Sequence, residues 1–236
     1  ARRGAEPDSI PNVQRGIDSD YDVRFIYAHE PEWYLRLEQQ RDVIEWALDE
    51  VLDINGWDLS KTLRLMRASN PTVFEWLNSP IIYHEDGVFS KVRELSCMSF
   101  APRPTIYHYL NMARKNRAEH LATERVKLKK YFYVMRSLLA ARWVAEKRTA
   151  PPVPFAELVR EELEPEMRPL FAELVRQKTH FCESGVVPRI PELDMWIEGA
   201  HQEVETSIPD VPPFDKPGWA PYDRTFFDIL GNVIDF

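Results

Sequence analysis

The spacing of the apolar residues changes at Asp58, and this change constrains the fold more than any other feature of the sequence. Before Asp58, aromatic and β-branched residues crowd into short segments such as 21–27, which is typical of β-strands. The runs "DVIEWAL" and "VLDIN" predict two further short strands. After Asp58, Leu59, Leu63 and Met66 recur at i, i+4 and i+7, which predicts a helix. Strands first and helices afterwards predict an α+β domain followed by a helical one.

Helix boundaries are marked by capping residues and prolines. Asp58 is the predicted N-cap of the first helix, and Asn70-Pro71 ends that helix. Asn70 then caps a second helix that has Pro71 at its first position. Four further helices are expected near 120–147, 155–163, 167–182 and 191–206.

Domain organisation follows from the break "APRP" at 101–104, after which the pattern is mostly helical. We expect an α+β domain over residues 1–100 and a helical domain over residues 101–236. The tail of the chain is rich in proline and then in aromatic residues. We expect it to wrap over the surface and to dock its last ten residues.

Composition excludes several classes of function. The net charge of −8 argues against a broad nucleic-acid-binding surface, although it leaves room for a local basic patch. Neither GxxxxGK[ST] nor GxGxxG occurs, so the sequence contains no glycine-rich phosphate loop of these kinds. No apolar stretch approaches the roughly 20 residues that span a bilayer. Cys97 and Cys182 lack CxxC spacing, and a reduced, cytoplasmic protein without a structural zinc fits best.

Alternating aspartates lead into the first predicted strand. Side chains on a strand alternate with a period of two, so Asp20, Asp22 and Arg24 share one face. Neighbouring like charges repel each other, and water or a divalent cation could offset the repulsion. Asp53 lies on a later strand and would face the pair if the two strands are neighbours. Solvated turn residues remain an alternative, because most D-x-D dipeptides at strand junctions have that role.

Paired carboxylates at this spacing suit phosphate chemistry. Mg²⁺ prefers one or two carboxylates together with substrate phosphate oxygens, so a D-x-D on a strand favours phosphoryl or nucleotidyl transfer. Asp20, Asp22 and Asp53 are the predicted ligands of Mg²⁺ or Mn²⁺. Asp53 is also a candidate general base for the attacking hydroxyl.

Three blocks of sequence carry a family resemblance. "DSDYDVRFIY", "DINGWDLSKTLRLMRASNPTVFEWLNSPIIY" and "VKLKKYFYVMRSLLAARWV" together resemble the predicted nucleotidyltransferases of the YcgL/RlaP-like family, in the polymerase-β nucleotidyltransferase superfamily. The resemblance implies a minimal nucleotidyltransferase fold, which is a small mixed sheet with flanking helices, followed by a helical domain. It also implies that Asp20, Asp22 and Asp53 hold Mg²⁺ around a nucleoside triphosphate.

The sequence departs from the family pattern ahead of Asp18. The family places a Gly-Ser motif there, whose backbone amides would bind triphosphate, whereas this chain reads "SIPNVQRGI". Either a segment that is not in this chain supplies the motif, or the protein lacks this way of binding phosphate.

Basic residues supply candidate phosphate ligands. Lys129, Tyr133 and Arg136 fall at i, i+4 and i+7 and form one helical stripe, either as phosphate ligands or as a solvated basic face. Arg24 could pair with the aspartates when metal is absent or bind substrate phosphate. Lys61 opposes the helix dipole in the first turn of its helix, which hints at an anion.

Most of the tryptophans are predicted to pack in the core. Five tryptophans fall inside apolar patterns and are predicted to be core, namely Trp33, Trp46, Trp57, Trp76 and Trp143.

The expected activity is transfer of NMP from an NTP to a hydroxyl of RNA, a protein or a small molecule, with release of pyrophosphate. One alternative is a non-catalytic relative that senses nucleotides or binds a protein. A metal-dependent nuclease is a further alternative. No membrane partner is expected.

Overall fold

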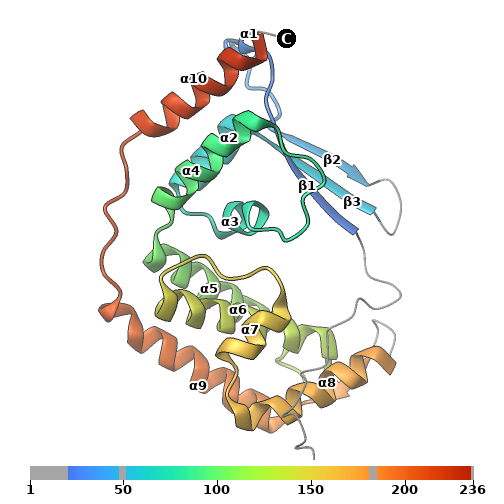
Figure 1. Cartoon of the computed structure of the whole chain (residues 1–236). Helices are drawn as coiled ribbons and strands as arrows, with labels where there is room; N and C mark the ends of the chain where they lie inside the picture. The colour runs from blue at the N-terminus through green and yellow to red at the C-terminus, as the bar shows by residue number, and fades with distance from the viewer. Residues whose placement is uncertain (1–20, 48–51, 181–184, 235–236) are drawn as a thin grey trace, which may run out of the picture. The chain divides into compact units, whose positions relative to one another are not determined.

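The computed structural model describes residues 21–47, 52–180 and 185–234. Contacts between Cα atoms divide them into two units. We call residues 21–105 with 211–234 the sheet unit, and residues 106–210 the helical unit (Figure 1). No helix in the described ranges has both the length and the apolar character needed to cross a membrane.

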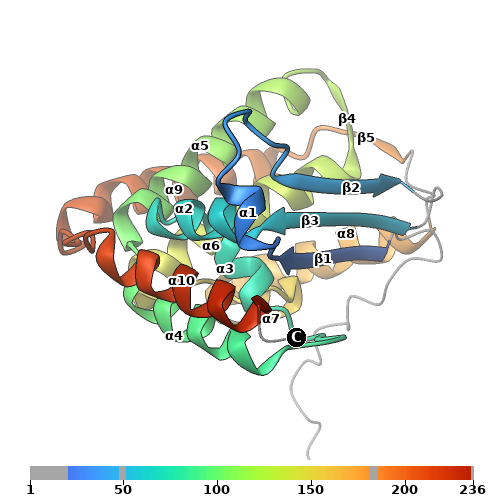
Figure 2. The ribbon, with the colours of Figure 1, turned by 90° about the horizontal axis from the view of Figure 1, so that it is seen from above.

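The sheet unit contains a mixed three-stranded sheet, as the family resemblance implied. Its strands are β1 (Tyr21–Tyr27), β2 (Val43–Ala47) and β3 (Leu52–Asp58), and β3 lies between the other two (Figure 2). β3 runs parallel to β1 and antiparallel to β2. The parallel register pairs Asp22 with Asp53 and Arg24 with Asn55, so these four residues share one face of the sheet.

The opposite face of the sheet is aromatic. Phe25 lies across Gly56, and a Cβ atom at position 56 would come within 2.2 Å of the phenyl ring. Only glycine lets the ring approach the backbone of β3 this closely. Phe25 also stacks on Trp46 and contacts Tyr27, with ring centroids 6.2 and 5.8 Å apart.

Helices α2 (Leu59–Arg67) and α3 (Pro71–Leu77) follow β3 and begin at the predicted caps. Asp58 Oδ1 accepts a hydrogen bond from Ser60 N at 2.8 Å, and Asn70 Oδ1 accepts one from Thr72 N at 3.0 Å. Each bond satisfies an amide that the first helical turn leaves without a partner. The predicted apolar stripe is buried at Leu59, Leu63 and Met66.

Later segments complete the sheet unit. A four-residue helix α1 (Pro31–Tyr34) follows β1, and η1 (Gly87–Phe89) leads into α4 (Ser90–Ser99). The tail forms α10 (Ala220–Ile234), which packs against α2 and α4 (Figure 1). Tyr222 is buried there and its hydroxyl donates to Ser99 Oγ at 2.8 Å. The tail therefore packs on residues 21–105, within the sheet unit. A domain boundary at residue 100 would instead assign the tail to the helical domain.

The helical unit is built around α6, most of whose side chains are buried. The helices α7, α8 and α9 all contact α6. The elements are α5 (Pro102–His120), β4 (Arg125–Lys127), α6 (Leu128–Lys147), α7 (Phe155–Glu162), η2 (Pro165–Met167), α8 (Arg168–His180), β5 (Val186–Pro188), α9 (Pro191–Ser207) and η3 (Ile208–Asp210).

One predicted helix is shorter than expected. The sequence predicted a helix over about 120–147, but α6 begins only at Leu128, because residues 125–127 form β4 and pair with β5. Leu128 N donates to Gly185 O at 2.9 Å and continues this pairing into the first residue of the helix. The partner strand lies about sixty residues away, and local periodicity carries no information about it. The helices α7, α8 and α9 begin within one residue of the predicted positions.

Candidate active site

A carboxylate–guanidinium cluster occupies the polar face of β1 and β3. Arg24 Nη2 donates to Asp22 Oδ1 at 2.6 Å and to Asp53 Oδ2 at 2.7 Å. Arg24 Nη1 donates to the backbone oxygens of Val23 and Asp53, both at 3.1 Å. Strand alternation thus places Asp53 beside Asp22, which is the geometry expected for neighbouring strands. Asp20 lies outside the described residues, and the catalytic and metal-binding roles of all three aspartates remain predictions.

The cluster is open to solvent. The side chains of Asp22 and Asp53 are 67% and 55% exposed, whereas that of Arg24 is 26% exposed. The guanidinium offsets the repulsion between the two carboxylates, one of the two roles expected for Arg24. Because water screens such exposed pairs, each contributes at most about 1 kcal/mol to stability. A competing cation or phosphate could therefore exchange with Arg24 at little cost to the fold.

The spacing of the carboxylates fits a small divalent cation. Since both oxygens contact the same nitrogen, they lie at most about 5.3 Å apart. Mg²⁺ binds oxygen at about 2.0–2.1 Å, so small side-chain rotations would bring both oxygens to one ion. In the described ranges, no group of three or more His, Cys, Asp or Glu side chains is arranged so that it could hold a metal ion. The described part of the site therefore offers two carboxylates, the number that Mg²⁺ commonly takes from a protein before water and phosphate complete its shell.

The polar face continues onto β2. Glu45 pairs in register with Asn55, and Asn55 Nδ2 donates to Glu45 Oε1 at 3.5 Å. Glu45 also forms an ion pair with Arg41 at 2.6 Å. Glu45 is not among the site residues predicted from the sequence, although the alternation of Val43, Glu45 and Ala47 could have placed it on this face. At the far end of the face, Trp57 stacks on Trp76 of α3, with centroids 3.9 Å apart.

Lys61 has an anionic partner inside its own unit. Its Nζ lies 2.8 Å from Asp42 Oδ1. The unfavourable position of this cation in the first turn of α2 is thus offset by a carboxylate of the same chain, and a bound phosphate is not needed to explain it. A phosphate-binding role for Lys61 stays a prediction.

The predicted stripe of Lys129, Tyr133 and Arg136 lies on α6, in the helical unit. Tyr133 is 46% exposed, and Lys129 and Arg136 are each part-exposed, so the three residues do form a solvent-facing stripe. Their role in phosphate binding stays a prediction.

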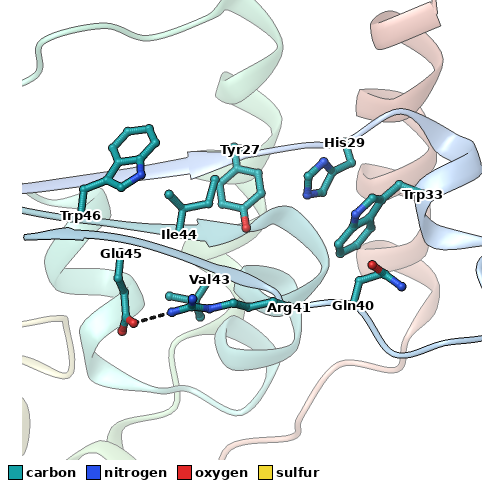
Figure 3. Close-up of a pocket in the computed structure, with 9 residues that line it drawn as sticks. All are labelled: Tyr27, His29, Trp33, Gln40, Arg41, Val43, Ile44, Glu45 and Trp46. Carbon is teal, nitrogen blue, oxygen red and sulfur yellow. Dashed lines mark hydrogen bonds and ion pairs between the residues drawn. The ribbon is translucent and has the colours of Figure 1, made fainter.

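A pocket of about 360 Å³ lies at the edge strand β2 and is lined by residues of both faces of that strand. His29 stacks on Trp33 with centroids 4.0 Å apart, and the Arg41–Glu45 ion pair lies at the edge strand (Figure 3). Burial, and then the charges of Asp58 and Asp42, raise the pKa of the Tyr27 hydroxyl. The lining residues are Tyr27, His29, Trp33, Gln40, Arg41, Val43, Ile44, Glu45 and Trp46.

One core prediction is wrong at this pocket. Trp46 falls inside an apolar run, yet it is 53% exposed, because β2 is an edge strand and no described element covers its ring. Phe25, on the far strand of the sheet, is its stacking partner.

Comparison with known proteins supports the resemblance seen in the sequence. Residues 15–228 match the family described as "RlaP: RNA repair pathway DNA polymerase beta family". The chain is 44% identical over 193 residues to the Bacillus subtilis (strain 168) protein YcgL, which is described as uncharacterized; the match covers 81% of this chain and 72% of YcgL. No solved structure gives a significant match.

Proposed function

We propose, from the premise that the chain belongs to the RlaP family of polymerase-β-like proteins, that it is a nucleotidyltransferase dependent on Mg²⁺ or Mn²⁺. The reaction would transfer NMP from an NTP to a hydroxyl acceptor and release pyrophosphate. RNA, a protein and a small molecule are the candidate acceptors, and the family description favours RNA.

The observation that supports this proposal most is the position of Asp22 and Asp53. They lie opposite each other on parallel strands, and one cationic nitrogen bridges them at 2.6 and 2.7 Å. The same two oxygens would hold the divalent cation, which would neutralise triphosphate charge in the transition state.

Each side chain of the site would then have a separate role in the reaction. Asp53 would position the acceptor hydroxyl and accept its proton, and Asp20 would be a further metal ligand. Arg24, once released from the carboxylates, could donate to phosphate oxygens through its planar fork. Lys61, Lys129, Tyr133 and Arg136 are the remaining proposed phosphate ligands.

The test is pyrophosphate release from each of the four NTPs, with Mg²⁺ or Mn²⁺ and a panel of hydroxyl acceptors. We expect Asp22→Asn and Asp53→Asn each to reduce the rate by about 100-fold or more, since each removes a metal ligand. Asp86→Asn is the matched control: Asp86 is exposed and caps η1, and asparagine caps as well as aspartate. Turnover by Asp22→Asn at the wild-type rate would overturn the proposal.

A second candidate is a relative that binds nucleotide without turnover. The internal pairing of Arg24 with both carboxylates favours it, because Arg24 supplies a positive charge at the position where a catalytic metal ion would bind. Calorimetry would then show NTP binding, and no acceptor in the panel would give pyrophosphate. Loss of RNA in the absence of added NTP would instead indicate the metal-dependent nuclease.

A further inference from the structure

The N-terminal half of α6 presents only basic and aromatic side chains to solvent. From Leu128 to Ala140 every position is buried except Lys129, Lys130, Tyr133 and Arg136. None of these four residues is acidic. Across residues 114–136 the chain carries eight Lys or Arg and two Glu, although its net charge is −8. A strongly basic strip therefore interrupts an acidic protein.

Aromatic rings accompany the cations of this strip. Three cations each lie over a ring, which is a favourable arrangement because the face of a ring is negative. Two of the rings, Phe132 and Phe155, also pack edge to face on Phe171, with centroids 5.7 and 5.6 Å away. The three pairs are Lys130–Tyr133 at 5.1 Å, Arg136–Phe155 at 6.0 Å and Lys178–Phe132 at 5.8 Å.

The other cations of the helical unit differ, because most of them have a carboxylate partner. Examples are Arg117 with Glu198, and Arg189 with Asp194 at 2.9 Å. Among the described residues, no carboxylate lies within 4.0 Å of the cationic groups of Lys130, Arg136 or Lys178. A ring does not neutralise a cation, so these three charges can still be matched by an external anion.

The neighbouring two-stranded ribbon extends the charge. Arg125 and Lys127 alternate with the buried Val126 on β4, and both are exposed. Lys127 directly precedes α6, so these cations continue the strip onto the ribbon. We name Arg125, Lys127, Lys130, Tyr133, Arg136 and Lys178 together the α6 basic surface.

We propose that the α6 basic surface binds a single-stranded nucleic acid, namely the acceptor strand of the proposed reaction. Surfaces of this kind combine cations that follow the phosphate backbone with aromatic rings on which bases stack, and they tolerate any sequence because every base has a flat face. Tyr133 is the ring available for a base, since it is 46% exposed and lies beside Lys130. This proposal rests on the proposed function for the identity of the strand and extends it from one triphosphate to several backbone phosphates.

The experiment measures fluorescence anisotropy of labelled 12-nucleotide RNA and DNA strands with the full chain, without NTP or metal, from 25 to 200 mM salt. We expect RNA and DNA strands to bind alike, because neither a cation nor a ring reads the 2′-hydroxyl. The triple variant Lys130→Gln, Arg136→Gln, Lys178→Gln should bind at least about tenfold more weakly. The slope of log K against log salt concentration should be shallower by about 2, because each phosphate contact with a single strand contributes roughly 0.7 to that slope.

The matched control is the triple variant Lys115→Gln, Lys147→Gln, Arg160→Gln. It removes the same charge from exposed positions of the same unit, but each of these cations lies within 3.8 Å of a carboxylate. We expect less than about a twofold change in affinity. Tyr133→Ala should weaken binding about tenfold with an unchanged salt slope, and Tyr133→Phe should bind like the wild type. Thermal unfolding midpoints identify any variant that fails to fold.

Several results would overturn the inference. Equal loss in the two triple variants would mean that only net charge matters. If the protein bound a 12-base-pair duplex or a polyglutamate peptide as tightly as the single strand, the surface would not be specific for single-stranded nucleic acid. If the triple variant Lys130→Gln, Arg136→Gln, Lys178→Gln lost NTP binding but bound the strand like the wild type, the surface would be a triphosphate site instead. Failure of the proposed function looks different, since the strand would still bind although no pyrophosphate is released.

Discussion

Arg24 of the sheet unit and three cations of the helical unit have different kinds of partner. In the sheet unit Arg24 lies between two carboxylates, whereas in the helical unit Lys130, Arg136 and Lys178 lie over aromatic rings. Carboxylates cancel the charge of a guanidinium, so Arg24 must leave them before a metal ion or a phosphate can bind. Rings leave the charge available. The first arrangement therefore suits exchange at a reacting centre, and the second suits binding of an anion that arrives from outside.

Arg142 shows a third arrangement, in which the cation is buried. Its Nη2 lies 2.8 Å from Glu164 and 2.6 Å from Glu203, and its Nη1 donates to Glu162 O at 2.9 Å. Burial alone would lower the pKa of Arg142, but Glu164 and Glu203 outweigh it and raise that pKa. A cation in this position is structural, since removal of either partner would leave a desolvated charge.

The largest expected effect is therefore on Arg142. Arg142→Met should lower the free energy of unfolding by about 3 kcal/mol, because two carboxylates and one buried carbonyl lose their partner. Urea denaturation measures the change. Arg160→Met, at an exposed position, should change it by less than about 0.5 kcal/mol. A cost for Arg142→Met as small as that of the control would remove the distinction between buried and exposed cations.

The next effect concerns a neighbouring carboxyl and depends on pH. Burial, followed by the charge of Glu146, raises the pKa of Glu162 to about 7. Between the unfolded pKa of about 4.3 and pH 7, the native state holds a proton that the unfolded state has lost, so stability should fall as pH rises through this window. Glu162→Gln cannot ionise, and at pH 8 it should be more stable than the wild type by about 2 kcal/mol.

Unfolding free energies at pH 5 and pH 8 check this prediction. The exposed neighbour gives the comparison: the charge of Glu161 is the smallest of the causes that act on the pKa of Glu162, so Glu161→Gln should change the pH dependence far less than Glu162→Gln. A Glu162→Gln protein that keeps the wild-type slope would show that another group titrates.

A smaller effect is expected on metal binding at the exposed cluster. Arg24→Met removes the cation that competes for Asp22 and Asp53, so Mn²⁺ should bind about tenfold more tightly in the absence of nucleotide, which corresponds to about 1.4 kcal/mol. Calorimetric titration with Mn²⁺ measures it. Arg41→Met, which frees only Glu45, is the control and should leave Mn²⁺ affinity unchanged. Weaker Mn²⁺ binding by Arg24→Met would contradict the competition.

The smallest effect on stability is expected at the α6 basic surface. Lys130→Gln, Arg136→Gln and Lys178→Gln should each lower the free energy of unfolding by about 0.5 kcal/mol, the usual contribution of a solvent-accessible cation over a ring. Thermal or urea denaturation is sufficient to test this. A loss above about 2 kcal/mol for any one of them would mean that this cation, like Arg142, supports the fold rather than a ligand.

Prediction from the sequence succeeded where the signal is local. The caps at Asp58 and Asn70 and the stripe of Leu59, Leu63 and Met66 depend on residues a few positions apart, and the structure confirms them. Prediction failed where a distant segment decides. The pairing of β4 with β5 shortened the expected helix, and the edge position of β2 left Trp46 exposed.

The sequence by itself determined which side chains share a face. Alternation along the strands puts Asp22 and Arg24 on one side of β1 and Asp53 on one side of β3, and the helical period aligns Tyr133 with Arg136. Only the tertiary structure decided what each face meets: Arg24 meets Asp53, which lies 29 residues further along the chain, and Lys178 lies over a ring of another helix. The physical reason is that periodicity follows from backbone geometry within one element, whereas the partner of a face depends on how the chain brings distant elements together.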